Sequence, residues 1–291
     1  MIIVGEFLMK LAGTVIFYNP DVSVLDNIRT YIDEIDLLII ADNSDIPNTQ
    51  LLSKLKKLGN KIQLISFGEN LGIAKALNTA ARLAVDKGYS HLLTMDQDSS
   101  FDKINISYLK NTAIKNKKMK FAVIAPVFSL KTEHVKRIRS NSGILDDVKS
   151  VITSGCILNL EAFNSAGGFC DKLFIDQVDH EFCLRARKKG YKTYILRDCF
   201  LNHNLGESVN AKFLFFKTRV TNHNYIRRYY MTRNGLYLAA HYWNKIPETI
   251  RKMTADIFKM IIFENDRIKK LRSVVLGIFD FIRCRYGKYD Y

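Results

Sequence analysis

Two carboxylates separated by one residue stand at the end of an apolar run. Residues 91–95 lead directly into Asp96, Gln97 and Asp98. In an extended chain, residues i and i+2 point the same way about 6.5–7 Å apart, so Asp96 and Asp98 can address one small polar target together. Two like charges this close repel each other unless a cation or hydrogen-bond donors offset them. The pair predicts either a cation-binding site or a solvated turn after a strand.

The segments before this pair alternate between predicted strands and helices. Apolar runs predict buried strands over residues 11–17, 35–41, 61–67 and 91–96. Apolar positions at helical spacing predict intervening helices near residues 25–32, 49–58 and 73–87. Repeats of this kind are typical of a parallel sheet covered by helices on both faces.

Polar residues follow each of the four predicted strands. Right-handed crossovers bring the ends of parallel strands to one edge of the sheet, which is where ligands bind in open α/β folds. The residues expected along that edge are 18–21, 42–44, 68–72 and 96–100. Because Asp96 and Asp98 share the edge with these other loops, a binding site is favoured over a solvated turn.

The phosphate-binding motifs of other nucleotide-binding folds do not occur in the sequence. No G-x-G-x-x-G follows the first strand, and no G-x-x-x-x-G-K-[ST] occurs in the chain. Where no glycine loop holds a phosphate, a metal held by carboxylates is the natural substitute. Asp96 and Asp98 are the candidates to supply it.

Further elements follow at residue 103. Helices are expected over 103–117 and 161–166, strands over 121–126, 152–160 and 192–196, and a loop or hairpin over 129–150. The segment 174–185 opens another helix, in which Asp176, Asp179 and His180 lie on one side of the first turn. These three residues either belong to a functional site or cap the N-terminus of the helix. Glu181 and Arg185, four residues apart, predict a structural salt bridge.

The net charge of +15 suggests an anionic partner. Its distribution is uneven: residues 212–291 hold 17 Lys and Arg against 6 Asp and Glu, a net charge of +11. Five cysteines without a C-x-x-C pair fit reduced thiols in the cytoplasm. The N-terminus has no basic region typical of a signal peptide, and the uncharged run 234–244, which no other uncharged run exceeds in length, is too short to span a bilayer.

The last third of the chain is predicted to be helical. Ile268, Leu271, Val275, Ile278 and Ile282 repeat at helical spacing, and lysines and arginines lie between them. Such helices either pack on the preceding domain or form a basic amphipathic surface on an anionic membrane. Each Lys or Arg near such a surface contributes about 1 kcal/mol.

These motifs, taken in order, resemble those of family 2 glycosyltransferases with the GT-A type fold, and within them the bacterial rhamnosyltransferase-like members. The resemblance covers about residues 11–240. It rests on Tyr18-Asn19-Pro20, Asp42-Asn43-Ser44, Asn70-Leu71-Gly72-Ile73-Ala74, Asp96-Gln97-Asp98, Val178-Asp179-His180-Glu181 and His203. Val178 departs from the family, in which a Glu commonly precedes the catalytic Asp. Arg233-Asn234 also resembles a pair found in the rhamnosyltransferase-like group, and no role is assigned to it here.

The resemblance implies roles for particular residues. The nucleotide-sugar would be bound by Tyr18, Asn19, Asp42, Asn70 and Asp96. A divalent cation, Mg²⁺ or Mn²⁺, would be bound by Asp98, with His203 completing its ligands. Asp179 would be the catalytic base.

The implied reaction is sugar transfer with inversion. A base deprotonates the incoming hydroxyl on one face of the anomeric carbon, and a stabilised diphosphate leaves on the other. The expected donor is dTDP-L-rhamnose, and the expected acceptor is a cell-surface polysaccharide or a lipid-linked saccharide precursor. Two alternatives remain: a sugar-nucleotide nucleotidyltransferase, or a non-enzymatic basic module that binds membranes or nucleic acid. Nucleic acid is disfavoured because the basic residues cluster away from the ligand edge.

The expected fold is α/β: a GT-A type, Rossmann-like, mostly parallel sheet with helices on both faces, followed by a basic helical region. We expect a catalytic domain over 1–210, with a nucleotide-binding half at about 9–100 and an acceptor half at about 101–210. The helical region over 211–291 would associate with the membrane. The protein is accordingly expected in the cytoplasm, peripheral on the inner face of the cell membrane.

Overall fold

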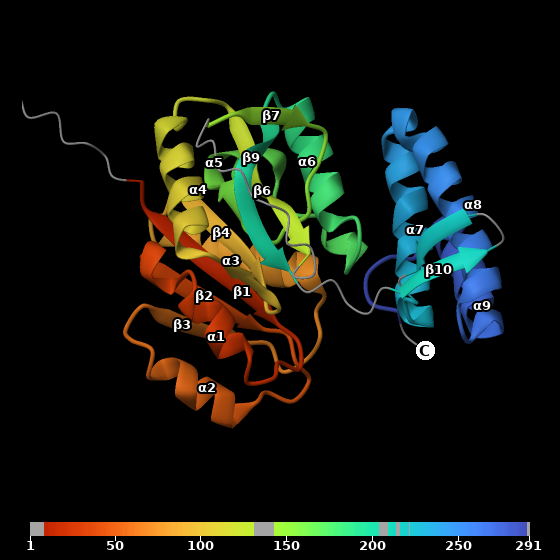
Figure 1. The fold of residues 1–291 in the computed structure, drawn as a ribbon, viewed down its shortest axis with the longest axis horizontal. Coiled ribbons are helices and arrows are strands. Elements are labelled where there is room, and N and C mark those ends of the chain that lie inside the picture. Colours follow the sequence, from red (N-terminus) through yellow and green to blue (C-terminus); the bar gives the residue numbers. More distant parts are fainter. Residues whose placement is uncertain (1–8, 131–142, 204–208, 214–215, 221, 290–291) are drawn as a thin grey trace, which may run out of the picture. The chain divides into compact units, whose positions relative to one another are not determined.

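A computed structural model of the chain describes residues 9–130, 143–203, 209–213, 216–220 and 222–289. Residues 1–8 and much of the region 129–150, on which the sequence analysis made predictions, lie outside the described residues. The chain divides into two compact units (Figure 1). The first consists of Met1–Cys170 and Asp179–Asn204, and the second of Asp171–Val178 and Leu205–Tyr291.

The first unit contains the alternating strands and helices. In chain order they are β1 (Leu11–Phe17), α1 (Val24–Arg29), β2 (Leu37–Asp42), α2 (Thr49–Lys56), β3 (Ile62–Ser66), α3 (Ile73–Asp86), β4 (His91–Asp96), β5 (Ser99–Phe101), α4 (Lys103–Lys115), β6 (Phe121–Leu130), β7 (Leu145–Val148), β8 (Cys156–Asn159), α5 (Leu160–Ala166), α6 (Val178–Lys188) and β9 (Lys192–His203). Val178, the first residue of α6, is grouped with the second unit.

The strands form one sheet in the order β3-β2-β1-β4-β8-β6-β9-β5, with β7 also paired to β9. Strands β3, β2, β1 and β4 are mutually parallel, which confirms the predicted first half. The second half is mixed, because β8 runs antiparallel to both β4 and β6, while β6 and β9 are parallel. β5 was not predicted: the chain turns after Asp98 and pairs antiparallel with β9.

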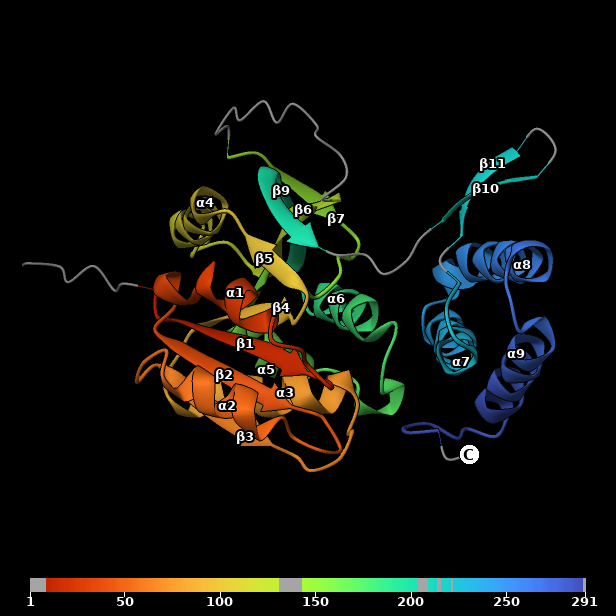
Figure 2. The same ribbon diagram turned by 60° about the horizontal axis from the view of Figure 1, so that its bottom comes forward.

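Helices cover both faces of this sheet (Figure 2). All seven residues of β1 are buried, as expected for a central strand covered on both sides. Leu11, Val15 and Phe17 belong to a core cluster with apolar residues of α1, α2 and α4. The small residues of α3 are buried as well, and this helix contacts β1, β2 and β4. Burial of these apolar side chains is the main force that holds the sheet edge in place.

The two ends of helix α5 are set by Asn159 and Gly167. Asn159 caps α5 by accepting hydrogen bonds from the backbone N–H groups of Glu161 (2.9 Å) and Ala162 (3.3 Å). The helix predicted over 161–166 ends where expected: Gly167 has a φ of 82°, the left-handed conformation that glycine adopts without steric cost.

The second unit contains helices α7 (Tyr225–His241), α8 (Ile246–Phe263) and α9 (Arg267–Ile282). It also contains an antiparallel pair, β10 (Val209–Phe213) and β11 (Phe216–Val220), which the helical prediction for this region did not anticipate. A Cβ atom on Gly277 of α9 would lie 2.8 Å from the Tyr229 carbonyl oxygen, so a glycine is required where α9 approaches α7. Glu264 pairs with both Arg228 and Lys270 in the interior of this unit.

Helix α9 packs within its unit through a face other than the predicted apolar stripe. Its buried residues are Lys270, Ser273, Val274 and Gly277. Of the stripe, Ile268, Leu271, Val275 and Ile282 are exposed. Over the residues that the structure covers, none of the helices has both the length and the apolar composition to cross a membrane.

Candidate active site

The loops after β1, β2, β3 and β4 lie along one edge of the sheet, because these strands are parallel. The strand register places Ile16 of β1 opposite both Ala41 and Asp96. The loops carry Tyr18 and Asn19 after β1, Asp42 at the end of β2, Asn70 after β3, and Asp96 at the end of β4. The expected clustering of the nucleotide-site residues at this edge is therefore observed.

Gln97 connects the first loop to the fourth. Its side-chain Oε1 accepts a hydrogen bond from the Tyr18 backbone N–H (2.9 Å), and its Nε2 donates to the Tyr18 carbonyl (3.2 Å). The Gln97 carbonyl in turn accepts a hydrogen bond from Asn27 Nδ2 (2.8 Å). The backbone N–H of Asn19, which has a φ of 46°, donates to Ser44 Oγ in the second loop (2.8 Å).

Asn43 and Asn70 connect the second loop to the third. Asn43 Nδ2 donates to Asn70 Oδ1 (2.9 Å), and Asn43 Oδ1 accepts from the Leu71 backbone N–H (2.8 Å). Asn70 Oδ1 also accepts from the backbone N–H of Gly72 at the start of α3 (3.0 Å). Asn70 therefore shapes the loop, whatever contact it makes with a ligand. The sequence analysis named Asn43 within the Asp42-Asn43-Ser44 motif but assigned it no role.

Asp42 presents a buried carboxylate oxygen at this edge. The residue is fully buried, and its Oδ1 accepts a hydrogen bond from the Ser44 backbone N–H (3.1 Å). Its Oδ2 is buried and has no hydrogen-bond partner among the described residues. An unpaired buried oxygen costs free energy, so this atom suits an N–H donor from a ligand. The exposed ring of Tyr18 offers a flat surface in the neighbouring loop.

A chain of hydroxyl groups fixes the turn that contains Asp96 and Asp98. The Asp96 backbone N–H donates to Ser154 Oγ (3.0 Å), and Ser154 Oγ donates to Ser99 Oγ (2.8 Å). Both serines are buried, whereas Asp96 and Asp98 are half-buried at the edge. These hydrogen bonds hold the backbone on both sides of Asp98 through one buried serine, Ser154.

The backbone of His203 lies beside this turn. In the antiparallel pairing of β5 with β9, His203 is the partner of Ser99, the residue after Asp98. The side chain of His203 lies outside the described residues. No group of three or more potential metal ligands is preassembled among the residues that the structure covers. The Asp98 carboxylate is nevertheless an oxygen ligand of the kind that Mg²⁺ and Mn²⁺ prefer.

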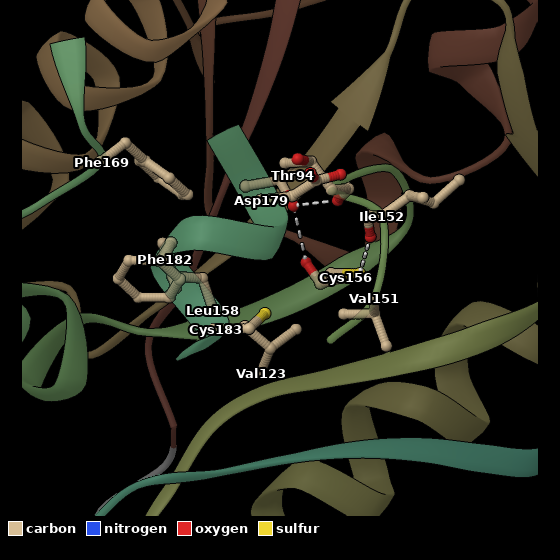
Figure 3. A pocket seen from close by; sticks show the side chains of 11 residues that line it. Thr94, Val123, Val151, Ile152, Cys156, Leu158, Phe169, Asp179, Phe182 and Cys183 are labelled. Atoms are coloured by element: carbon tan, nitrogen blue, oxygen red, sulfur yellow. Dashed lines mark hydrogen bonds between the residues drawn. The ribbon is translucent and has the colours of Figure 1, made fainter. Parts of the chain in front are cut away.

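Asp179 is the second residue of α6 and lines a small cavity (Figure 3). The cavity has a free volume of about 20 Å³, room for one water molecule, and its other lining residues include Thr94, Cys156, Phe169 and Phe182. Thr94 and Cys156 are paired across β4 and β8, and Thr94 Oγ1 donates to the carbonyl of Thr153 (2.6 Å). The helix start is thus placed against the strand that ends in Asp96.

The Cys156 thiol is buried beside Asp179. Burial raises its pKa well above the ordinary value, and the nearby groups Cys183, Asp179 and Asp96 raise the pKa further. Asp179 lines the same small cavity as Cys156 and Thr94, and Thr94 lies two residues before Asp96 in β4. The start of α6 and the strand that ends in Asp96 therefore meet at this cavity.

The prediction for the first turn of α6 was wrong for one residue. Asp176 precedes the helix, has a φ of 62° and belongs to the second unit, where Arg227 lies 3.3 Å from it. His180 Nδ1 lies 2.6 Å from Ser150 Oγ. The predicted salt bridge is confirmed: Arg185 forms a two-pronged pair with buried Glu181 at 2.6 and 2.9 Å.

Sequence comparison identifies the class of protein. Residues 21–163 match the family described as "Glycosyl transferase family 2". A relative from Shigella flexneri, the dTDP-rhamnosyl transferase RfbF, is 27% identical, with 94% of this chain and 96% of that protein covered. An uncharacterized protein of Mycobacterium tuberculosis is 24% identical, with 61% of this chain and 67% of that protein covered.

Solved structures show the same fold. The S. aureus protein TarS, residues 1–349, superposes with a TM-score of 0.59 at 14% identity, with 95% of this chain and 81% of that chain covered. GalNAc-T7 with UDP, GalNAc and Mn²⁺ superposes with a TM-score of 0.57 at 13% identity. That match covers 68% of this chain, which spans only 44% of the GalNAc-T7 chain. These likenesses support a glycosyltransferase, with a family 2 match over residues 21–163 and a GT-A type fold shared with the solved structures.

Proposed function

We propose that the protein transfers a sugar, with inversion, from a nucleotide-sugar to a hydroxyl group of a saccharide acceptor. The observation that carries the proposal is the cavity that Asp179 shares with Thr94, because Thr94 lies two residues before Asp96 in a strand that ends at the edge of the four loops. A carboxylate base beside a nucleotide-binding edge is what inverting transfer requires.

The donor site is proposed to be the edge formed by the first four strands. The buried Asp42 oxygen would accept an N–H group of the nucleotide base, and the exposed Tyr18 ring would stack on it. Asn19 and Asn70 would shape the loops around the nucleotide, and Asp96 would contact the ribose. We assign the nucleotide to residues 9–100 and the acceptor to 101–210, within a catalytic domain over 1–210.

A divalent cation, Mg²⁺ or Mn²⁺, is proposed to be held by Asp98 and His203. The half-buried Asp98 carboxylate and the β5–β9 pairing that brings the His203 backbone beside Ser99 support this assignment. When bound, such a cation supplies Lewis-acid stabilisation to the leaving diphosphate. GalNAc-T7, which shares the fold, has been solved with Mn²⁺.

Asp179 is proposed to be the base. Its carboxylate takes the proton of the acceptor hydroxyl while the hydroxyl oxygen forms a bond to the anomeric carbon. The bond between that carbon and the diphosphate oxygen breaks on the opposite face, and the nucleoside diphosphate leaves with the electron pair. The start of α6 is anchored by buried Phe182 and Cys183, so the carboxylate is held in a defined place.

The proposed donor is dTDP-L-rhamnose, and the proposed acceptor is a cell-surface polysaccharide or a lipid-linked precursor. The relative RfbF, described as a dTDP-rhamnosyl transferase, matches over 96% of its own length and supports this choice. The net charge of +11 over residues 212–291 and the exposed apolar residues of α8 and α9 support membrane association. We therefore propose that the protein acts at the inner face of the cell membrane.

The test is a panel of nucleotide-sugars, dTDP-L-rhamnose first, scored for release of nucleoside diphosphate. We expect Asp179→Asn to lower kcat by about 10²–10⁴, the usual contribution of a general base, while the dissociation constant of the donor stays unchanged. Asp86→Asn, at the exposed end of α3, is the matched control and should leave kcat unchanged. Unchanged turnover in Asp179→Asn, or release of pyrophosphate instead of nucleoside diphosphate, would refute the proposal.

A further inference from the structure

The turn that carries Asp96 and Asp98 joins two different parts of the sheet. Strand β4 ends at Asp96 and pairs with β1 and β8, whereas β5 begins at Ser99 and pairs with β9. In the described sheet, β8, β6 and β9 lie between β4 and β5, which are not paired with each other. Three residues of chain span at most about 10 Å, so the sheet must curl until β5 begins close to the end of β4. No strand pairing between β4 and β5 therefore holds this turn.

Ser154, in the loop before β8, bridges the two strands at this point. Its Oγ accepts a hydrogen bond from the Asp96 N–H at the end of β4 (3.0 Å) and donates one to Ser99 Oγ at the start of β5 (2.8 Å). Ser154 and Ser99 are both buried, so water does not compete for these bonds. One hydroxyl group therefore joins the two ends of the turn.

Both chain neighbours of Ser154 are fixed to Thr94 of β4. Thr94 Oγ1 donates to the Thr153 carbonyl (2.6 Å), and the Gly155 N–H donates to the Thr94 carbonyl (2.7 Å). Gly155 has a φ of 73°, and a Cβ atom at this position would lie 2.8 Å from the buried side chain of Leu201. A glycine therefore lets the loop approach the sheet closely, which places the Ser154 hydroxyl at the turn.

Both chain neighbours of Asp98 are held in turn. Gln97, which precedes it, forms two hydrogen bonds with the backbone of Tyr18. Ser99, which follows it, is bonded to Ser154. All of these residues belong to the first compact unit. The position of the half-buried Asp98 carboxylate thus depends on contacts on either side of it.

We propose that Ser154 is a positioning residue for the Asp98 carboxylate and thereby sets the affinity of the protein for a divalent cation. Asp96 and Asp98 carry like charges, which repel each other and favour a more open turn. A turn already fixed by Ser154 loses little conformational freedom when a cation binds, so ordering the turn offsets less of the binding free energy. This inference rests on the proposed role of Asp98 as a cation ligand.

The test is the affinity of the full chain for Mn²⁺, followed by electron paramagnetic resonance. Ser154→Ala removes both hydrogen bonds to the turn, and we expect the Mn²⁺ dissociation constant to rise at least fivefold. Ser99→Ala removes one of the two bonds and should raise the constant by a smaller factor. The double variant should match Ser154→Ala within twofold, because both substitutions act through the same hydroxyl group.

Two results would overturn the inference: an unchanged Mn²⁺ dissociation constant in Ser154→Ala, or factors that multiply in the double variant. If Ser154→Ala does not fold, Ser99→Ala, which keeps the bond to Asp96, carries the test alone. An unchanged constant in that variant would then overturn the inference.

Asn78→Ala is the matched control. Asn78 is buried in α3 of the same unit, and its side chain donates to the Phe169 carbonyl (2.9 Å) and accepts from the Phe169 N–H (2.7 Å). The substitution therefore removes two buried hydrogen bonds to a different loop. Its Mn²⁺ dissociation constant should stay within twofold of wild type. A loss of affinity equal to that of Ser154→Ala would trace the effect to general destabilisation and overturn the inference.

A second measurement uses the protein without a cation. Hydrogen exchange of the peptide 95–101 should accelerate at least fivefold in Ser154→Ala, because the Asp96 N–H loses its acceptor. Asn78→Ala should leave the exchange of this peptide unchanged. Equal protection of the peptide in wild type and Ser154→Ala would overturn the inference.

The two proposals fail in different ways. If Asp98→Asn leaves the Mn²⁺ dissociation constant unchanged, the proposed cation ligand is wrong, whatever Ser154 does. If Asp98→Asn weakens Mn²⁺ binding and Ser154→Ala does not, the cation ligand stands and the positioning role is wrong. The positioning role is also wrong if Ser154→Ala weakens Mn²⁺ binding by the same factor in the Asp98→Asn background.

Discussion

The side-chain amide of Gln97 pairs with the backbone of Tyr18 through two hydrogen bonds, at 2.9 Å from the Tyr18 N–H and 3.2 Å to its carbonyl. Gln97 is the middle residue between Asp96 and Asp98, and Tyr18 lies 79 positions earlier. The residue that separates the two carboxylates therefore also fixes the loop proposed to hold the nucleotide base. A change in either loop is transmitted to the other through this pair.

Replacing Gln97 should weaken donor binding. Gln97→Ala removes both hydrogen bonds to Tyr18, each with a net value of about 0.5–1.5 kcal/mol, so the donor dissociation constant should rise about 5- to 150-fold. Calorimetric titration with dTDP or dTDP-L-rhamnose measures it. Gln50→Ala, on the exposed surface of α2, is the control. Unchanged donor affinity in Gln97→Ala would show that the loop contact has no part in binding.

Removing the cation should stop nucleotide release. We expect EDTA to abolish turnover and added Mg²⁺ or Mn²⁺ to restore it. Without a cation to offset its negative charge, the diphosphate is a poor leaving group beside Asp96 and Asp98. Asp98→Asn should lower the affinity for Mn²⁺, followed by electron paramagnetic resonance, and Asp86→Asn should not. Full activity in chelator would exclude a cation from the reaction.

Acid should destabilise the first unit through His91. Burial lowers the pKa of His91 to about 4, from 6.5 in the unfolded chain, so the unfolded state binds the proton more tightly. The stabilisation is fully present above pH 6.5 and is lost as the pH falls towards 4, with an upper bound of about 3 kcal/mol. His91→Phe, which retains a ring beside Phe121, should reduce this dependence in denaturant titrations.

His223 provides the comparison in the second unit. Burial, followed by the charges of Arg227 and Arg228, also lowers its pKa to about 4. His91→Phe should therefore remove only part of the acid sensitivity of the whole chain. The assignment to His91 would be wrong if wild type and His91→Phe lost stability in parallel between pH 6.5 and 4.

The exposed apolar residues of α9 should contribute to membrane binding. Ile268 is 79% exposed and Phe279 is 50% exposed, beside exposed Lys269 and Arg272. Replacing both apolar residues with Asp should lower the partition coefficient on phosphatidylserine-containing vesicles at least tenfold, because these side chains would no longer enter the lipid. A tenfold loss corresponds to about 1.4 kcal/mol of membrane-binding free energy. Flotation measures the bound fraction. Ile104→Asp, at a 60% exposed position on α4, should bind like wild type.

Elements with a strong local pattern were predicted well. The strand predicted over residues 11–17 is β1, Leu11–Phe17, because an apolar run ends sharply at Asn19 and Pro20. The hairpin of β10 and β11 was missed: residues 209–220 contain no glycine, and each strand is stabilised by pairing with the other. β5 was also missed because it is stabilised by pairing with another strand, and that strand, β9, lies about 100 residues further along the chain.

The sequence by itself determined the four-strand edge and the order of its polar loops, because hydrophobic periodicity and turn residues act over short distances. It also singled out Asp42, Asp96, Asp98 and Asp179. Only the tertiary structure decided that Gln97 and Asn43 join the loops, and that Asp179 lines a cavity with Thr94 and Cys156. It also decided that the Ser154 hydroxyl joins the two ends of the turn between β4 and β5. Hydrogen bonds between distant residues depend on the folded geometry, and no local pattern encodes them.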